Sequence, residues 1–304
     1  MRLQALSLSK GRNGAGKRRL QSNRLEALFD DKVEDAYLSN ELGIEELSWL
    51  ICRGGWPAAL SMTRSGAIKQ SINYIEAIAG IDISAVDGVK RDKSFTLRLL
   101  RSYARFQGAQ APLASIYEDM KTNAENMMTE ETVASYISAL KKLFIIEDAP
   151  AWNPNLRSKT AIRTSDTRYF VDPSIATAAL GTGPEDLLSD LQTLGLLLET
   201  LCIRDLRIYA EALDGHLYHY RDKNGLECDA VMHLRNGRYG LIEIKLGGQR
   251  LIDEGAATLT SLSNKIDTTK MKEPSFKMII TGTGAYAYKR KDGIWIAPIG
   301  CLRP

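Results

Sequence analysis

The stretch LECDAVMHLRNGRYGLIEIKLGG, residues 226–248, decides the fold that we predict for this chain. Apolar residues recur at every second position over 227–234 and again over 238–246, which is the pattern of strands with one buried face. Between these two runs lies the dipeptide Asn236-Gly237, which strongly favours a hairpin turn. The stretch therefore predicts a β-hairpin.

The length of the turn decides which side chains meet across this hairpin. A two-residue turn places Asp229 opposite the apolar Ile244, whereas a three-residue turn, 235–237, places Asp229 opposite Glu243. Only the longer turn aligns the apolar faces of the two strands, and a slip by one residue moves every side chain to the other face. We therefore expect the three-residue turn, with Gly237 in the left-handed conformation.

That register places three charged side chains on one face of the hairpin: Asp229, Glu243 and Lys245. This arrangement predicts a site for phosphodiester hydrolysis. Two adjacent carboxylates repel each other, so one is protonated or the pair costs stability unless a partner is present. A Mg²⁺ (or Mn²⁺) ion removes this conflict, because hard cations bind carboxylate oxygens. The metal polarises a phosphate and activates a water, which Lys245 can position. The alternative reading is a surface cluster of salt bridges without catalysis.

A further carboxylate, Glu199, lies on the apolar face of the long helix predicted over residues 186–209. Its neighbours on that face include Leu196, Cys202 and Ile203. An ionised carboxylate in such surroundings is costly unless it is paired or binds a metal. Glu199 is therefore a third predicted metal ligand and a fourth predicted catalytic residue, beside the three of the hairpin.

The elements around the hairpin follow a definite order. A strand pattern at 216–221 precedes it, a helix pattern at 251–265 follows it, and a strand pattern at 276–281 comes next. Together with the helix at 186–209, the predicted order is α-β-β-β-α-β.

This order, with Glu199 on the first helix, Asp229 on the second strand and Glu243-x-Lys245 on the third, resembles the PD-(D/E)XK restriction-endonuclease-like fold. The resemblance implies a nuclease-like domain over residues 173–304. Each of these motifs is common by itself. Their occurrence in this order on these elements is what makes the resemblance specific.

Residues 93–172 predict a separate, winged-helix-like domain. Three short helical patterns lead to the apolar run LFIIED, 143–148, and then to a basic stretch, 155–172. Either Thr129 or Thr132 can cap the third helix. Three short helices followed by a β-hairpin with a basic loop are typical of winged helices, which set a helix in the DNA major groove. Such modules also serve purely for contact with other proteins.

The basic stretch supplies the DNA contacts that we expect. Before its end it sets four cations against a single acid, Asp166. Lys and Arg provide most of the contacts that proteins make with phosphates. The candidate DNA-binding residues are Arg157, Lys159, Arg163 and Arg168.

Two segments complete the predicted organisation, an α+β multidomain chain. Residues 25–92 have helical patterns, which we expect to end at Gly54 and at Gly80. Residues 1–24 contain many basic residues and no acid, which is typical of a disordered tail. The chain thus consists of a basic tail, a helical segment, a winged-helix domain and the nuclease-like domain.

The tail contains an incomplete phosphate-binding loop. Gly11, Gly16 and Lys17 have the spacing of a P-loop, but Arg18 stands where a Ser or Thr hydroxyl would hold Mg²⁺. No clean strand pattern leads into this segment. We therefore expect no ATP binding by this chain.

The composition sets further limits on the class of protein. The net charge of +3 does not indicate a polyanion partner, so nucleic-acid contacts have to come from local patches. The four cysteines form no CxxC pair, so we expect reduced core residues in a cytoplasmic protein and neither a zinc site nor a disulfide framework. No apolar run approaches the roughly 18 residues of a membrane span, so we expect no membrane partner.

Four longer motifs resemble one bacterial family. They are ICRGGWPAAL at 51–60, RSKTAIRTSDTRYFVDPSIATAAL at 157–180, the run from Leu194 to Val231, and LIEIKLGG at 241–248. These motifs resemble the AAA-type ATPases that carry a C-terminal domain of unknown function 4143, which is itself PD-(D/E)XK-like. Members of that family begin with a complete ATPase domain. Residues 25–60 of this chain resemble only the last helices of that ATPase domain.

The resemblance implies that the chain is a fragment that has lost its motor domain. The start, MRLQALSLSKGR, resembles the translation of a repetitive bacterial intergenic element. Two readings of the function stay open: a metal-dependent nuclease, and a catalytically inactive DNA- or protein-binding module. The partners that these readings favour are DNA, an intact ATPase and a second copy of this chain.

Overall fold

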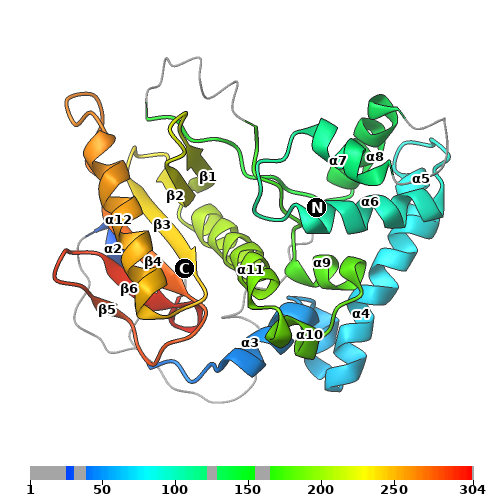
Figure 1. The fold of residues 1–304 in the computed structure, drawn as a ribbon, viewed down its shortest axis with the longest axis horizontal. Coiled ribbons are helices and arrows are strands. Elements are labelled where there is room, and N and C mark those ends of the chain that lie inside the picture. Colours follow the sequence, from blue (N-terminus) through cyan, green and yellow to red (C-terminus); the bar gives the residue numbers. More distant parts are fainter. Residues whose placement is uncertain (1–24, 31–38, 122–128, 155–164, 303–304) are drawn as a thin grey trace. The chain divides into compact units, whose positions relative to one another are not determined.

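The computed structural model describes residues 25–30, 39–121, 129–154 and 165–302 (Figure 1). The described residues form two compact units. Unit 1 contains Ser48–Ala149 and Ser165–Thr200, and unit 2 contains the described parts of Ser7–Leu47, Pro150–Thr164 and Leu201–Pro304. The predicted basic tail and its incomplete P-loop lie outside the described residues.

Unit 1 is helical, and several of its helices begin at a side-chain cap. Thr129 Oγ1 accepts a hydrogen bond from Thr132 N at 3.2 Å, so Thr129 is the cap of the helix that begins at Glu130. Asp92 Oδ1 accepts from Phe95 N at 2.6 Å in the same way. The helices are α3 (Ile44–Arg53), α4 (Arg64–Ala77), α5 (Ile83–Ala85), α6 (Lys93–Arg105), α7 (Leu113–Met120), α8 (Glu130–Lys142), α9 (Pro173–Leu180) and α10 (Pro184–Ser189).

The helical path through Gly80 differs from the sequence expectation. Helix α4 ends at Ala77, and a π-helical turn, Ile78–Asp82, leads directly into α5. Gly80 therefore lies inside a helical run and does not end it. The backbone at this glycine is helical, so the residue type alone gave the wrong boundary.

The long helix expected over 186–209 is broken. Helix α10 ends at Ser189, and α11 (Leu191–Ala212) begins after Asp190, whose backbone is not helical. Asp190 Oδ1 accepts a hydrogen bond from Thr193 N at 3.1 Å. This aspartate therefore caps α11, a role that the apolar periodicity of the segment hid.

The segment after α8 pairs with the segment before α9. Ile146 forms an antiparallel bridge with Phe170, and Ala149 forms one with Thr167. Glu147 N also donates to Tyr169 O at 3.0 Å. The strand pairing expected after the third helix is thus present as isolated bridges, and the basic loop that joins the two segments lies outside the described residues.

Unit 2 is built on a six-stranded mixed sheet with the order β1-β2-β3-β4-β6-β5. Strands β1, β2 and β3 are antiparallel, β4 lies parallel to β3, and β6 lies parallel to β4. The predicted strands are confirmed, and β5 and β6 are additions to the predicted order. The strands are β1 (Gly215–Arg221), β2 (Glu227–Leu234), β3 (Tyr239–Lys245), β4 (Phe276–Thr281), β5 (Tyr288–Lys289) and β6 (Trp295–Pro298).

The predicted register of the central hairpin is confirmed. Ala230 pairs with Ile242 and Met232 with Gly240, so the turn between β2 and β3 has three residues. Leu234 N donates to the carbonyl oxygen of Arg238 at 2.8 Å and closes this turn. Gly237 has a φ of 80°, as a left-handed turn residue requires.

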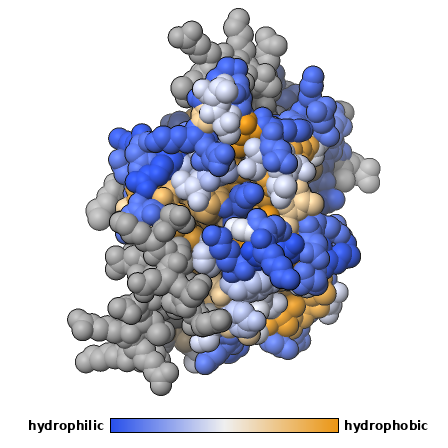
Figure 2. All heavy atoms as spheres, turned by 90° about the vertical axis from the view of Figure 1, so that its left-hand side faces the viewer, coloured by the Kyte–Doolittle hydropathy of each residue, from blue (hydrophilic) through white to orange (hydrophobic). Residues whose placement is uncertain are grey.

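Helix α12 (Gln249–Lys265) covers one face of the sheet. Val231, Leu241 and Ile279 project from three neighbouring strands into one apolar cluster with the buried face of this helix. Burial of a side chain of this size stabilises a fold by about 1.5–3 kcal/mol. The surface seen from the side of α12 is mostly hydrophilic (Figure 2).

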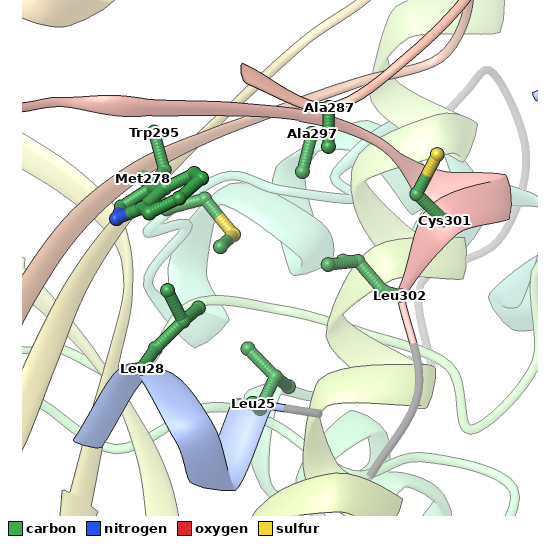
Figure 3. A pocket seen from close by; sticks show the side chains of 8 residues that line it. All are labelled: Leu25, Leu28, Met278, Ala287, Trp295, Ala297, Cys301 and Leu302. Carbon is green, nitrogen blue, oxygen red and sulfur yellow. The ribbon is translucent and has the colours of Figure 1, made fainter. Parts of the chain in front are cut away.

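The opposite face of the sheet packs against helix α2 (Leu25–Phe29) and the C-terminal segment. Phe29 meets the Phe276 ring edge-on, with centroids 5.0 Å apart. A Cβ at Gly240 would lie 2.2 Å from the same ring, so this position has to be glycine. A small pocket remains between these elements (Figure 3), lined by Leu25, Leu28, Met278, Ala287, Trp295, Ala297, Cys301 and Leu302. No described helix is both long enough and apolar enough to cross a membrane.

Candidate functional site

The hairpin brings Asp229, Glu243 and Lys245 together in unit 2. The ladder between β2 and β3 runs up to Ala230 and Ile242, so Asp229 and Glu243 are the next residues along the two strands. Lys245 Nζ lies 2.5 Å from Glu243 Oε2 and 3.4 Å from Asp229 Oδ2. One ammonium thus contacts both carboxylates.

Backbone contacts fix the orientation of Asp229. Its Oδ2 atom accepts a hydrogen bond from Ile244 N at 2.7 Å, which takes the place of a ladder bond between the strands. The carboxylate is therefore turned toward β3 and toward Lys245. With 19% of its side chain exposed, Asp229 is the carboxylate of the pair with more access to solvent.

Glu243 is almost completely buried, with 3% exposure. The pKa of Glu243 is raised to about 8. Burial raises it most, the negative charge of Asp229 raises it further, and Lys245 opposes both effects. For Lys245, burial lowers the pKa, but the attraction of Asp229 and Glu243 outweighs it, so the net pKa is raised. The lysine is therefore charged and balances one carboxylate, and below about pH 8 a proton on Glu243 balances the other.

Helix α12 approaches this cluster closely at Gly255. A Cβ added to Gly255 would lie 3.5 Å from Glu243 Cβ and 3.5 Å from Lys245 Cε. Cys228 belongs to the apolar cluster that the sheet forms with α12, and its Sγ donates to Ile242 O at 3.3 Å. Burial, together with the charges of Glu243 and Asp229, raises the pKa of the Cys228 thiol. The cluster is thus enclosed by close packing.

Glu199, the remaining predicted catalytic residue, has its described contacts in unit 1. The Tyr169 hydroxyl donates a hydrogen bond to Glu199 Oε1. A Cβ added to Gly108, whose φ is 70°, would lie 3.0 Å from each Glu199 carboxylate oxygen. The Tyr169 hydroxyl therefore offsets part of the free-energy cost of burying this carboxylate. The role of Glu199 as a metal ligand stays a prediction.

The structure describes one of the four candidate DNA contacts. Arg168 Nη1 lies 2.7 Å from Asp148 Oδ2, and Arg168 Nε donates to Ala111 O at 2.9 Å. Asp148 also accepts from Tyr103 Oη and pairs with Lys141 at 2.7 Å. Arg168 thus belongs to a buried ionic network of unit 1. The remaining candidates, Arg157, Lys159 and Arg163, lie outside the described residues.

Sequence reasoning missed the residues that hold this network together. In the sequence, Asp148 marks only the end of an apolar run, and Tyr169 lies within the basic stretch. Their partners come from other parts of the chain, so no local pattern marks them. The one available signal was the position of an acid directly after four apolar residues, at the end of LFIIED.

The motif at 51–60 also has a structural explanation. Gly55 N donates to Asp172 Oδ2 at 2.9 Å, and Trp56 Nε1 donates to Ser174 Oγ at 2.8 Å. Gly54 has a φ of 73°, and a Cβ there would lie 2.4 Å from Ser174 Oγ. We call these contacts the Gly54–Ser174 clasp, which fastens the end of α3 to the start of α9.

The donor set for a metal ion consists of two carboxylates. Within the described ranges, no group of three or more His, Cys, Asp and Glu side chains is arranged to hold a metal ion. Asp229 and Glu243 contact one shared cation, and Glu243 is the almost completely buried member of the pair. These two residues could hold a hard cation, and the cation that contacts them here is the Lys245 ammonium.

Comparison with known proteins gives two matches to family models. Residues 44–186 match the domain of unknown function DUF8612, and residues 194–302 match the domain of unknown function DUF4143. No curated protein and no solved structure is significantly similar to the chain. The second match confirms, for this part of the chain, the resemblance to the domain of unknown function 4143, and it includes Asp229, Glu243 and Lys245.

Proposed function

We propose that unit 2 is a Mg²⁺- or Mn²⁺-dependent nuclease domain that hydrolyses phosphodiester bonds. Its active site consists of Asp229, Glu243 and Lys245. One observation carries the proposal: Lys245 Nζ contacts Glu243 Oε2 at 2.5 Å and Asp229 Oδ2 at 3.4 Å. Because both carboxylates reach the same nitrogen atom, they are close enough to bind one ion.

The charge balance of the cluster favours a divalent ion. One ammonium balances one carboxylate, and a proton balances the other below about pH 8, because burial and Asp229 raise the pKa of Glu243 to that value. A divalent cation balances both charges at once. Mg²⁺ usually binds proteins through one or two carboxylates and completes its shell with waters and substrate phosphates. The donor set of Asp229 and Glu243 therefore fits this ion.

Each residue of the cluster has a distinct role in this proposal. When bound, the metal ion polarises a phosphate oxygen and lowers the pKa of a water. Asp229 and Glu243 hold the ion, and the hydrogen bond from Ile244 N keeps Asp229 oriented toward it. Lys245 positions the attacking water and offsets the negative charge that develops on the phosphate.

The order of elements supports the same proposal. The run from α11 through β1, β2, β3 and α12 to β4 fits a PD-(D/E)XK-like arrangement, although the first part of α11 belongs to unit 1. The helices α6, α7 and α8 and the antiparallel bridges after them fit a winged-helix-like arrangement in unit 1. In this proposal the winged-helix part binds DNA through Arg157, Lys159 and Arg163, while Arg168 is held by Asp148. An intact AAA-type ATPase is a proposed partner, and this chain binds no ATP itself.

A second function, a DNA- or protein-binding module without catalysis, is favoured by a different observation. Each predicted metal ligand has a protein partner: Lys245 for Asp229 and Glu243, and Tyr169 for Glu199. A cluster of this kind can serve as a buried salt bridge that fixes the hairpin. The two functions differ in whether the carboxylates exchange their partner for a metal ion.

Cleavage assays on the full chain distinguish the two functions. We expect Mg²⁺ or Mn²⁺ to support cleavage of duplex DNA, single-stranded DNA or RNA, and we expect Asp229→Asn and Lys245→Met to abolish it. Asp253→Asn is the matched control, because Asp253 is an exposed carboxylate of α12 that pairs with Arg290 at 2.6 Å. If the parent protein neither binds metal nor cleaves nucleic acid, and Asp229→Asn still binds DNA, the nuclease is excluded. The binding module is then the function that remains.

A further inference from the structure

We propose that Lys245 is a built-in competitor of the metal ion, so that the ion enters only when the Lys245 ammonium leaves the carboxylates. This inference rests on the proposed function, because it concerns the regulation of the same site. It assigns Lys245 two successive tasks. Before metal binding it is the counter-ion of the site, and after metal binding it is the group that faces the substrate phosphate.

The contacts of Lys245 carry this inference. Its ammonium lies 2.5 Å from Glu243 Oε2 and 3.4 Å from Asp229 Oδ2, so it takes the position that a cation shared by both carboxylates needs. Two cations at one position repel strongly where burial weakens screening. Lys245 and a metal ion therefore exclude each other, and the affinity for metal is reduced by the cost of moving the lysine.

The surroundings of Lys245 allow it to leave. Its side chain is 23% exposed, so part of it borders solvent. The α12 residue that faces its Cε atom is Gly255, which contributes no side chain at this point. The lysine side chain carries a strongly hydrated ammonium on a flexible four-carbon stem. The charge can therefore move outward while Glu243 stays in place.

Chemical labelling of the wild-type protein tests the displacement directly. Acetylation of Lys245 by an N-hydroxysuccinimide ester is measured by peptide mass spectrometry, with and without saturating Mn²⁺. We expect labelling of Lys245 to rise several-fold with Mn²⁺. The displaced amine is exposed, and the positive charge beside it favours the neutral form of the amine, which reacts with the ester. Lys265 is the control, since it pairs with Asp222 at 2.6 Å, outside the cluster, and its labelling should not change. Free Mn²⁺ is measured independently by electron paramagnetic resonance.

A binding measurement on variants gives a second readout. Lys245→Met removes the competitor, and we expect the Kd for Mn²⁺ to fall at least tenfold at pH 8.5, which corresponds to about 1.4 kcal/mol. Lys265→Met removes the same charge from the same unit outside the cluster, and we expect it to bind Mn²⁺ like the parent. An unchanged or weaker affinity of folded Lys245→Met overturns the inference.

The outcomes separate this inference from the proposed function. Mn²⁺ binding with unchanged labelling of Lys245 overturns the inference alone and leaves the nuclease intact. Mn²⁺ binding with increased labelling but no cleavage of any nucleic acid supports the inference and counts against the nuclease. If no variant binds Mn²⁺, both fail.

Discussion

Lys245 Nζ lies 2.5 Å from Glu243 Oε2, and these two residues of one strand form an ion pair in a site where the glutamate is 3% exposed. They are two positions apart in β3, so their side chains share one face of the sheet. The pair makes the stability of unit 2 depend on pH, because the charge on Glu243 is costly in this environment.

The first prediction concerns this pH dependence. The pKa of Glu243 is raised to about 8 in the folded protein, above its ordinary value of 4.5, mainly by burial. The folded state therefore binds more protons than the unfolded state between these values, and this contribution to stability is lost as the pH rises through about 8. The slope is at most about 1.4 kcal/mol per pH unit. Urea unfolding at pH 5 to 9 measures it, and Glu243→Gln should remove this part of the dependence. An equal slope in Glu243→Gln contradicts the assignment.

The second prediction concerns Glu199. Its carboxylate accepts a hydrogen bond from Tyr169 Oη, so Tyr169→Phe leaves a half-buried carboxylate without this donor. We expect a loss of about 1.5–3 kcal/mol in the free energy of unfolding, as for other hydrogen bonds to charged groups. The affinity for Mn²⁺ should not change, which is measured by calorimetry on the same variant. A change in Mn²⁺ affinity in Glu199→Gln would instead establish Glu199 as the metal ligand that the sequence predicts.

The third prediction tests the Gly54–Ser174 clasp. Gly54→Ala places a Cβ 2.4 Å from Ser174 Oγ at a φ of 73°. Gly181 is a matched control, because it has the same φ of 73° and nothing within 4 Å of an added Cβ. Gly181→Ala should therefore show only the cost of the left-handed backbone, about 1–2 kcal/mol. We expect Gly54→Ala to be clearly less stable than Gly181→Ala in urea unfolding. Equal losses in the two variants would show that the clasp adds no steric constraint.

The fourth prediction concerns the His233 side chain. Trp152 Nε1 donates to His233 Nδ1 at 3.2 Å, and burial lowers the pKa of His233 from its ordinary value of 6.5. Protonation removes this acceptor, and the unfolded state takes up the proton more readily. The stability from this group is therefore present above pH 6.5 and is lost as the pH falls below it. Tryptophan fluorescence during urea unfolding measures the effect, and His233→Phe should lack it.

Local patterns account for the part of the site that was predicted correctly. Strand alternation and the Asn236-Gly237 turn define the hairpin, and the apolar faces admit only one register. That register alone brings Asp229 beside Glu243 and Lys245. Within unit 1, the sequence offers two threonines as the cap of α8, and the hydrogen bond of Thr129 decides between them.

Other features have no local pattern. The helix expected to end at Gly80 continues through a π-helical turn, and the helix expected to be continuous breaks at Asp190. Glycine and apolar periodicity indicate average tendencies, whereas packing and capping decide each boundary. Asp190 is a cap only because the backbone before α11 leaves the helix there.

The sequence by itself thus determined the succession of strands β1 to β4 along the chain, the three-residue turn and the adjacency of Asp229, Glu243 and Lys245. The physical reason is that strand pairing follows the alternation of neighbouring residues. Only the tertiary structure decided that Glu199 is bonded to Tyr169, that Arg168 is held by Asp148, and that one lysine contacts both carboxylates. These contacts depend on side-chain packing and on the cost of burying charge, which residue spacing does not encode.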